Sequence, residues 1–95
     1  GALRVDTGAL RAIRRGRSLL PAGVTSASGS FDRGDLIAIE DQTGQVIGHG
    51  LTAYSAADTR VILGHKSREI EGLLGYRGQD EVVHADNLVM LEQGG

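Results

Sequence analysis

The strongest constraint on the fold is the stretch of residues 14–24, which reads Arg-Arg-Gly-Arg-Ser-Leu-Leu-Pro-Ala-Gly-Val. Gly16 follows a helical pattern, and a residue without a Cβ adopts positive φ at a helix C-terminus at little cost. Pro21, the only proline, is excluded from a helix interior and favours an extended Leu20 before it. The sequence therefore predicts a helix that ends at Gly16 and a strand that starts within 19–24, at a sheet edge or a bulge.

The length of 95 residues predicts a single domain over residues 1–95, because a second hydrophobic core does not fit. No run of about 18 apolar residues and no charged segment followed by an apolar block is present, so we expect neither a membrane span nor a signal peptide. The lack of cysteine removes disulfides and thiolate chemistry and fits a reducing compartment. We therefore expect a cytoplasmic protein without membrane contact, and a loose tail at about 92–95.

The net charge of −2 argues against a protein that binds nucleic acid over its whole surface. The basic residues are nevertheless clustered, since five of the ten lie in residues 1–17. The aromatic residues are only Phe31, Tyr54 and Tyr76, which disfavours a platform for stacked bases. The fifteen glycines are spread along the chain and indicate many tight turns between short strands.

The first elements are predicted to be a short strand over Leu3–Val5 and a helix over Thr7–Arg15, with Asp6 as its N-cap. Apolar side chains share one arc of the helical wheel: Ala9, Leu10, Ala12 and Ile13. Arginines share the opposite arc: Arg11, Arg14 and Arg15. This basic arc has two interpretations, a solvated helix face or a patch for anions or a phosphate backbone that Arg17 continues past the turn.

The middle of the chain is predicted to form a hairpin. The run Leu36–Ile39 lacks alternation, which suggests a strand covered on both faces or one in a small closed barrel. Residues 41–44 have the composition of a turn, and the return strand is expected over Gln45–Tyr54. Gly48 and Gly50 lie on one face of that strand and predict close approach by another segment.

Two short helices and a split strand are expected in the last part of the chain. Ser55 to Asp58 fits a capping box that opens a helix through Leu63. A second helix, with an apolar stripe at Ile70, Leu73 and Leu74, is predicted to end at Gly75. Strand is expected at 82–83 and 88–91 with an interruption at 85–87, whereas residues 25–30 are expected to be a loop or a strand tail.

Motifs for metal, nucleotide or nucleophile chemistry are not supported by the sequence. His49, His65 and His84 are too widely spaced for a metal-ligand pattern. The glycines at 44, 48 and 50 match neither a P-loop nor a dinucleotide fingerprint. We therefore expect no catalytic residue and no metal site in this chain.

Seven blocks of residues, spread over nearly the whole chain, carry a resemblance to a known family. They are Val5-Asp6-x-Gly8-Ala9, Gly16-x-Ser18-Leu19-Leu20-Pro21-Ala22-Gly23-Val24, Gly34-Asp35, Gly50-Leu51-x-x-Tyr54-Ser55, Lys66-Ser67-x-Glu69-Ile70, Gly75-Tyr76 and His84-x-Asp86-Asn87-Leu88. The chain resembles PUA domains, and most closely the C-terminal PUA domains of bacterial glutamate 5-kinases. It departs from that pattern at Ala56, where a second serine is common, and at Ala85, where an arginine is common, so the turn at 84–87 lacks the positive charge that an anion contact would use.

The resemblance implies a mainly β, α+β fold, a pseudo-barrel of about five to seven short strands with two or three short helices. It also implies an accessory or regulatory domain of an enzyme that phosphorylates glutamate in proline biosynthesis. In such an enzyme a separate kinase domain of the same chain binds ATP and Mg²⁺, so no cofactor is expected in the present residues. A homo-oligomer of the full-length enzyme is compatible with this resemblance.

PUA domains at large bind RNA through the first helix and the following strand, which is the alternative function. The residues that would line such an RNA groove are Arg11, Arg14, Arg15, Gly16, Arg17, Ser18, Pro21, Ala22 and Gly23. The acidic total charge and the few aromatic residues favour the kinase-associated role. If RNA binds, we expect the binding to be weak.

Overall fold

The computed structural model describes residues 1–91, which form five strands and three α-helices. The predicted loose tail at about 92–95 lies outside the described residues. The α-helices are α1 (Thr7–Arg14), α2 (Ala56–Ile62) and α3 (Ile70–Leu74). Three short 3₁₀ helices accompany them: η1 (Pro21–Gly23), η2 (Ser67–Glu69) and η3 (Ala85–Asn87).

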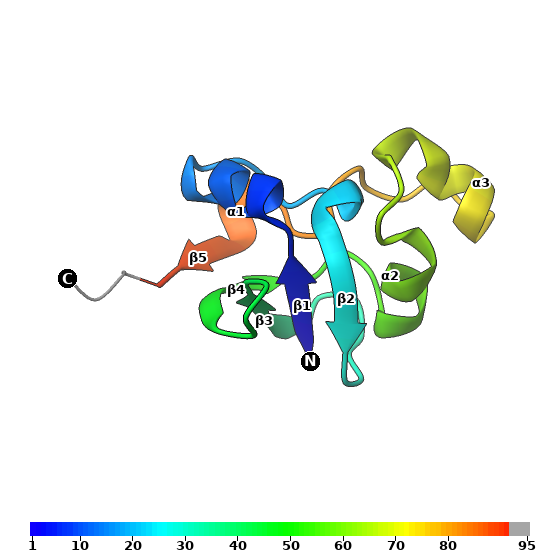
Figure 1. The fold of residues 1–95 in the computed structure, drawn as a ribbon. Coiled ribbons are helices and arrows are strands. Elements are labelled where there is room, and N and C mark those ends of the chain that lie inside the picture. The colour runs from blue at the N-terminus through cyan, green and yellow to red at the C-terminus, as the bar shows by residue number, and fades with distance from the viewer. Residues whose placement is uncertain (92–95) are drawn as a thin grey trace.

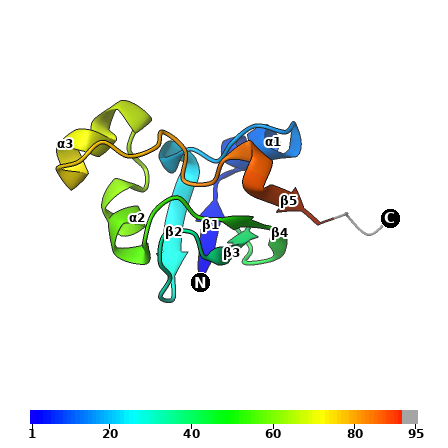
Figure 2. The same cartoon turned by 180° about the vertical axis from the view of Figure 1, so that it is seen from behind.

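The strands form one mixed sheet in the order β2-β1-β3-β4-β5. They are β1 (Ala2–Val5), β2 (Val24–Ser28), β3 (Leu36–Glu40), β4 (Val46–Leu51) and β5 (Leu88–Met90). β1 is parallel to β3, and the other three pairings are antiparallel. In Figures 1 and 2, α1 lies above the end of β1, whereas α2 and α3 lie beyond β2, away from β4 and β5. The predicted α+β fold with short strands and three short helices is therefore confirmed.

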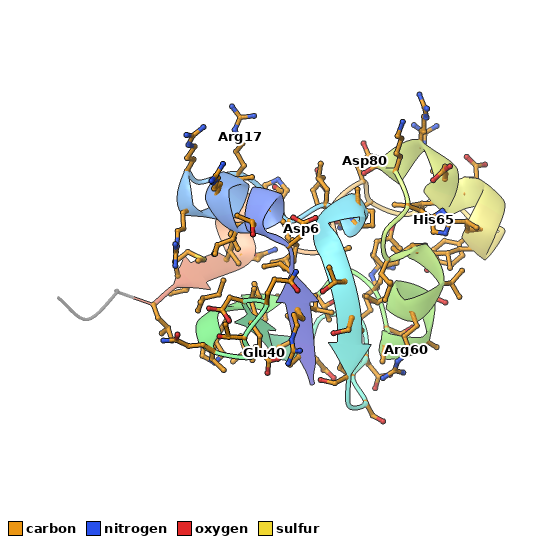
Figure 3. The ribbon with its side chains drawn as sticks, viewed as in Figure 1. Asp6, Arg17, Glu40, Arg60, His65 and Asp80 are labelled. Atoms are coloured by element: carbon orange, nitrogen blue, oxygen red, sulfur yellow. The ribbon has the colours of Figure 1, made fainter. Side chains whose placement is uncertain are left out.

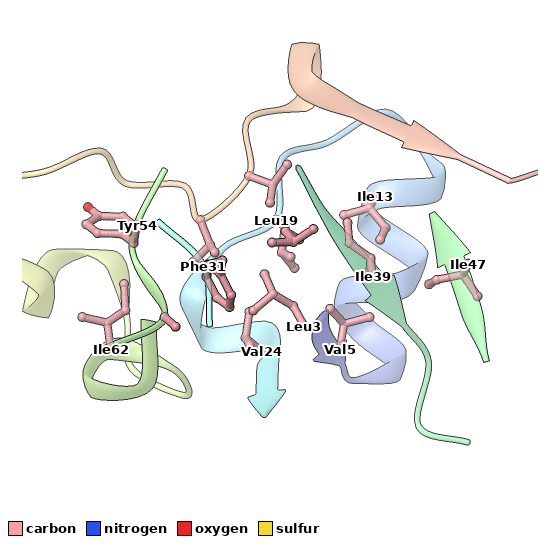
Figure 4. Close-up of a cluster of buried hydrophobic side chains, with 14 of the residues drawn as sticks. Leu3, Val5, Ile13, Leu19, Val24, Phe31, Ile39, Ile47, Tyr54 and Ile62 are labelled. Carbon is pink, nitrogen blue, oxygen red and sulfur yellow. The ribbon is translucent and has the colours of Figure 1, made fainter. Parts of the chain in front are cut away.

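The hydrophobic core lies on one face of this sheet. Alternate residues of β1 and β3 point into it, namely Leu3, Val5, Ile37 and Ile39, because successive side chains of a strand face opposite ways. Figure 4 shows Leu3, Val5 and Ile39 packed with Ile13 of α1 and with apolar residues from the other elements. The rest of the buried cluster is Leu19, Val24, Phe31, Ile47, Tyr54, Ala56, Ile62, Ile70, Val82 and Val83.

The predicted close approach at Gly48 and Gly50 is confirmed. A Cβ on Gly48 would lie 2.7 Å from the carbonyl oxygen of Val89, and one on Gly50 would lie 2.5 Å from Cγ1 of Val83. Both distances are too short for a real side chain. These glycines therefore let the chain segment 83–90 lie directly against β4.

Helix α2 begins as predicted at its N-cap, but the capping box is only half formed. The Ser55 hydroxyl accepts a hydrogen bond from the Asp58 amide at 3.2 Å. The Asp58 carboxylate, which was expected to bond back to Ser55, accepts instead from the Tyr76 hydroxyl at 2.6 Å. At the helix end, Arg60 donates to the carbonyl oxygens of Ala27 and Gly29 and so ties α2 to β2.

The predicted strand start within Leu19–Val24 was wrong in part. Leu20 is extended, as expected before a proline, but residues 21–23 form the 3₁₀ helix η1 and β2 begins only at Val24. Proline at the first position of a helix has its φ already set and loses no hydrogen bond there. Pro21 therefore opens a helical turn, closed by the Val24 amide on the Pro21 carbonyl, instead of lying at a sheet edge.

The predicted strand bounds also needed correction. The return strand covers Val46–Leu51, not residues 45–54, and Thr52 begins a turn in which its hydroxyl bonds the Tyr54 backbone. Val83 forms a single bridge with Leu19, so residues 82–83 are not a strand of the sheet. Residues 25–28 belong to β2, so of the two expected alternatives, a loop or a strand tail, the second is observed there.

Strand β3 differs most from its expected surroundings. Its lack of alternation predicted either cover on both faces or a strand of a small closed barrel. The first alternative is not met, because the described residues cover only the face that carries Ile37 and Ile39, and such one-sided cover is what a strand of a barrel-like fold has. Leu36, at the start of the strand, is 66% exposed. The described domain therefore leaves one apolar sheet face open to solvent.

Candidate binding groove

A groove of about 450 Å³ lies between α1 and the segment that leads into β2. Its lining residues are Asp6, Gly8, Ala9, Ala12, Arg17, Ser18, Leu20, Ala22, Gly23 and Glu81. The first wall is the start and one face of α1, and the second is the segment 17–23. The groove therefore lies where the sequence resemblance placed an RNA-binding surface.

The first wall is fixed by the cap at the start of α1. The Asp6 carboxylate accepts from the Ala9 amide at 2.7 Å, as predicted for an N-cap. The Asp6 amide in turn donates to the Gly23 carbonyl at 2.9 Å, which joins the two walls of the groove. Asp6 therefore has a structural role at the floor of the groove, and Figure 3 shows it at the foot of α1.

Gly16 ends α1 in the way the sequence predicts. Its φ is +82°, and the amides of Gly16 and Arg17 donate to the carbonyls of Ile13 and Ala12. These two bonds form a Schellman motif, which reverses the chain direction at a helix end. The reversal brings Arg17 and Ser18 back towards the groove that the helix itself lines.

The second wall is held in place by residues far along the chain. Leu19 exchanges backbone hydrogen bonds of 2.8 and 2.9 Å with Val82 and Val83, and the Ser18 hydroxyl accepts from the Ala85 amide at 2.8 Å. These bonds also bring Glu81 to the rim of the groove. No local pattern in the sequence signals that placement, because Glu81 is distant along the chain from the other lining residues.

Gly23 sets the width of the groove floor. A Cβ on Gly23 would collide with the Cβ of Ala9, so η1 and α1 pack as closely as they do only with glycine at this position. Small residues at 8, 9, 12 and 22 leave the space above that contact empty. The hollow therefore results from a run of small side chains on both walls.

The predicted site residues divide into two groups. Arg17, Ser18, Ala22 and Gly23 line the groove. The others lie elsewhere: Arg11, Arg14, Arg15 and Gly16 are exposed outside the groove lining, and Pro21 is buried. Lining residues that the sequence reasoning missed are Asp6, Gly8, Ala9, Ala12, Leu20 and Glu81.

The charges of the groove are mixed. Its lining carries one cation, Arg17, and two carboxylates, Asp6 and Glu81. Figure 3 shows the Arg17 side chain extending away from the ribbon. Outside the groove, the hydrogen bond from the Thr43 hydroxyl lowers the pKa of the Asp41 carboxyl most. Backbone hydrogen bonds and the positive charge of Arg14 lower it further. The groove lining is therefore not a uniformly basic surface of the kind that phosphate backbones need.

The histidines and acidic residues within 1–91 form local pairs and no metal cluster. This part of the chain contains no group of three or more histidine, cysteine or acidic side chains placed to hold a metal ion. Two of the histidines lie next to a nearby carboxylate instead. Nδ1 of His65 is 3.2 Å from Oε2 of Glu69, and Nδ1 of His84 is 3.6 Å from Oδ2 of Asp86. Over the same residues, no helix has the length and hydropathy that crossing a membrane requires.

Comparison with known proteins agrees with the fold. The PUA domain family model matches residues 1–74. Glutamate 5-kinase from Paramagnetospirillum magneticum is 58% identical over 90 residues, which is 95% of this chain and 24% of that protein. Glutamate 5-kinase from Allorhizobium ampelinum is 54% identical over 95 residues, again 24% of its own length. The chain therefore spans about a quarter of the length of the curated relatives it matches.

Solved structures show the same fold at lower sequence similarity. A PUA domain from Aeropyrum pernix K1, crystallised with tartrate, superposes with a TM-score of 0.64 over 88% of this chain and 41% of its own. The identity of 24% makes this a likeness of fold only. Together with the family match over residues 1–74, it shows that this chain belongs to the PUA domain family.

Proposed function

We propose that this chain is the C-terminal, non-catalytic accessory domain of a glutamate 5-kinase. The observation that carries the proposal is the 58% identity over 90 residues to a glutamate 5-kinase of which those residues form about a quarter. On this proposal, a kinase domain elsewhere in the polypeptide binds ATP, Mg²⁺ and glutamate in the cytoplasm and transfers the phosphoryl group to the side-chain carboxylate. The present domain acts on regulation or assembly.

The geometry of the groove supports a role without chemistry. Its carboxylate at residue 6 is committed to capping α1, and the serine at residue 18 accepts from the backbone of Ala85. Among the described lining residues, the Ser18 hydroxyl forms no hydrogen bond with either carboxylate, Asp6 or Glu81, that would pair a nucleophile with a base. A phosphoryl transferase also needs a phosphate-cradling loop and metal-binding acids, and these belong to the proposed kinase domain.

RNA binding is the less favoured alternative. The groove lining has mixed charge and so offers few cations for phosphate contacts. The few aromatic residues of the chain offer little for base stacking. The fold does not decide the matter, because the fold of a domain does not fix its function. The candidate RNA contacts therefore stay a prediction, as does a homo-oligomer of the full-length enzyme.

The proposal is tested by separating the two parts of the full-length enzyme. The purified 95-residue chain is expected to form no glutamyl phosphate from ATP and glutamate, because no phosphoryl-transfer machinery is proposed for it. The enzyme without this domain is expected to keep its turnover, with changed inhibition by the pathway end product or a changed oligomeric state. Glutamyl phosphate made by the 95-residue chain, or unchanged regulation and assembly after the deletion, would contradict the proposal.

A further inference from the structure

One face of the sheet carries a row of apolar side chains that nothing in the described domain covers. We call it the outer sheet face and define it by Leu36 and Ala38 of β3, His49 and Leu51 of β4, and Val89 of β5. Leu36 is 66% exposed, Leu51 43% and Val89 68%. A contiguous exposed apolar patch on a small soluble domain marks an interaction surface more often than an isolated exposed side chain does.

The strand register shows that these side chains are neighbours. Leu36 lies opposite Leu51, and His49 lies opposite both Ala38 and Val89. Residues opposite each other in a sheet carry side chains on the same face, with their Cβ atoms about 5 Å apart. The five residues therefore form one surface across three strands, on the face opposite to Ile37, Ile39, Gly48 and Gly50, which are buried.

The helices of the domain lie elsewhere. Figures 1 and 2 place α2 and α3 beyond β2, at the edge of the sheet far from β5, and α1 at the end of β1. The outer sheet face continues across β3 and β1 to the pair of Arg4 and Glu40, which lie 3.4 Å apart. The outer sheet face thus combines exposed apolar side chains, the imidazole of His49 among them and a charged pair at its margin. Apolar area with a polar rim is the usual anatomy of a protein–protein interface.

The arrangement of β1 indicates which partner fits this surface. β1 is parallel to β3, so its first residues lie beside the start of β3, where Leu36 and its neighbour Leu51 are located. The Ala38 amide donates to the Gly1 carbonyl at 3.0 Å, which fixes the chain at that position. In a longer polypeptide, the residues before this domain would therefore emerge next to the outer sheet face, and the relatives are about four times as long as this chain.

We propose that the outer sheet face is the surface on which the kinase domain of the same polypeptide docks. This inference rests on the proposed function and adds the surface through which the domain acts. The occupant is an apolar protein surface, which covers Leu36, Leu51 and Val89 and so supplies the second cover that β3 lacks. Interfaces between domains of one chain typically bury about 600–1,500 Å² in total, a size that a three-stranded sheet face can provide.

The test uses cysteine accessibility in the full-length enzyme, because residues 1–95 contain no cysteine of their own. Leu51→Cys probes the outer sheet face, and Val61→Cys on α2 is the matched control, since the two native side chains are 43% and 45% exposed in the domain. Modification by a maleimide is followed at each site by mass spectrometry. Equal rates in denaturant, and glutamyl phosphate formation by both variants, show that the comparison is valid.

Docking predicts that the thiol at position 51 reacts at least about tenfold more slowly than the thiol at 61 in the folded enzyme, because it reacts only when the interface opens. A photoreactive maleimide on the thiol at 51 should then crosslink to peptides of the kinase domain. Equal reaction rates at the two positions would overturn the proposal. Crosslinks to residues 36–51 of a second copy would overturn it as well and would identify the face as a homotypic interface.

The outcomes also separate this inference from the proposed function. Protection at position 51 together with unchanged regulation after domain deletion would leave the docking surface in place and remove the regulatory role. Altered regulation after deletion, with equal labelling at 51 and 61, would keep the role and reject this surface.

Discussion

The groove beside α1 and the outer sheet face differ in how they are built. The groove is a small hollow whose charged residues are Arg17, Asp6 and Glu81. The outer sheet face is a flat surface across β3, β4 and β5 with exposed Leu36, Leu51 and Val89. The cluster of arginines in the sequence predicts a site beside α1, whereas the structure shows exposed leucine and valine side chains on the sheet.

The comparison shows that the basic helix and the groove are only partly the same surface. Arg11 on α1 and Arg15 at its C-cap are exposed outside the groove lining. An exposed leucine pair with no cover, in contrast, has an energetic cost that a partner can remove, at about 25 cal/mol per Å² of apolar surface buried. The predictions below change residues on each side of this comparison.

The largest expected effect separates the two faces of β3. Ile39→Ala removes a fully buried side chain from the core and should lower the free energy of unfolding by about 2–5 kcal/mol. Leu36→Ala, in the same strand but mostly exposed, should change it by less than about 0.5 kcal/mol. Urea denaturation of the 95-residue chain measures both values, and comparable losses would mean that the outer sheet face is covered within the domain.

The next effect concerns the floor of the groove. Gly23→Ala places a Cβ against that of Ala9, and the overpacking should destabilise the domain by about 1–3 kcal/mol. Gly8→Ala is the control, because its new Cβ meets nothing closer than Asp6 Oδ1 at 3.5 Å and alanine favours a helix by up to about 1 kcal/mol. Denaturation midpoints that fall equally for both variants would show that the close contact of η1 and α1 is not what shapes the groove.

A smaller effect is expected at the turn that closes the groove. Gly16→Val should lower the free energy of unfolding by more than about 1 kcal/mol, because a β-branched residue is forced to a φ of +82°. No other atom lies within 4 Å of the added Cβ, so the cost is that of the backbone alone. Gly16→Asn should lose less, since asparagine tolerates this conformation, and an unchanged midpoint for the valine variant would show that the cap is unimportant.

Local signals in the sequence predicted those element boundaries at which a single residue determines the backbone conformation. Asp6 and Gly16 bound α1 as expected, because an N-cap carboxylate and a glycine at positive φ act within one turn. Pro21 was misplaced, since the same fixed φ fits a strand edge and the first turn of a 3₁₀ helix. Only the fold around it distinguishes these two environments.

The candidate site was predictable only where its lining residues lie close together in the sequence. Arg17, Ser18, Ala22 and Gly23 lie in one stretch, and the family resemblance identified them together. Glu81 reaches the groove through the hydrogen bonds of Leu19 with Val82 and Val83, which no sequence periodicity indicates. The apolar run of β3 left two alternatives open, cover on both faces or a small closed barrel, and no local signal showed that the described residues leave the face of Leu36 exposed.

RNA binding by the 95-residue chain at about 150 mM salt, a physiological ionic strength, tests most directly whether this domain serves its own polypeptide. The account predicts a dissociation constant in the micromolar range or weaker, without sequence selectivity, because stacking residues are few and the groove lining is of mixed charge. Tight, sequence-selective binding would contradict the account. In that case a log–log salt slope of about −3, made less steep by about 1.4 in Arg14→Ala/Arg15→Ala, would assign the binding to four arginines, namely Arg11, Arg14, Arg15 and Arg17.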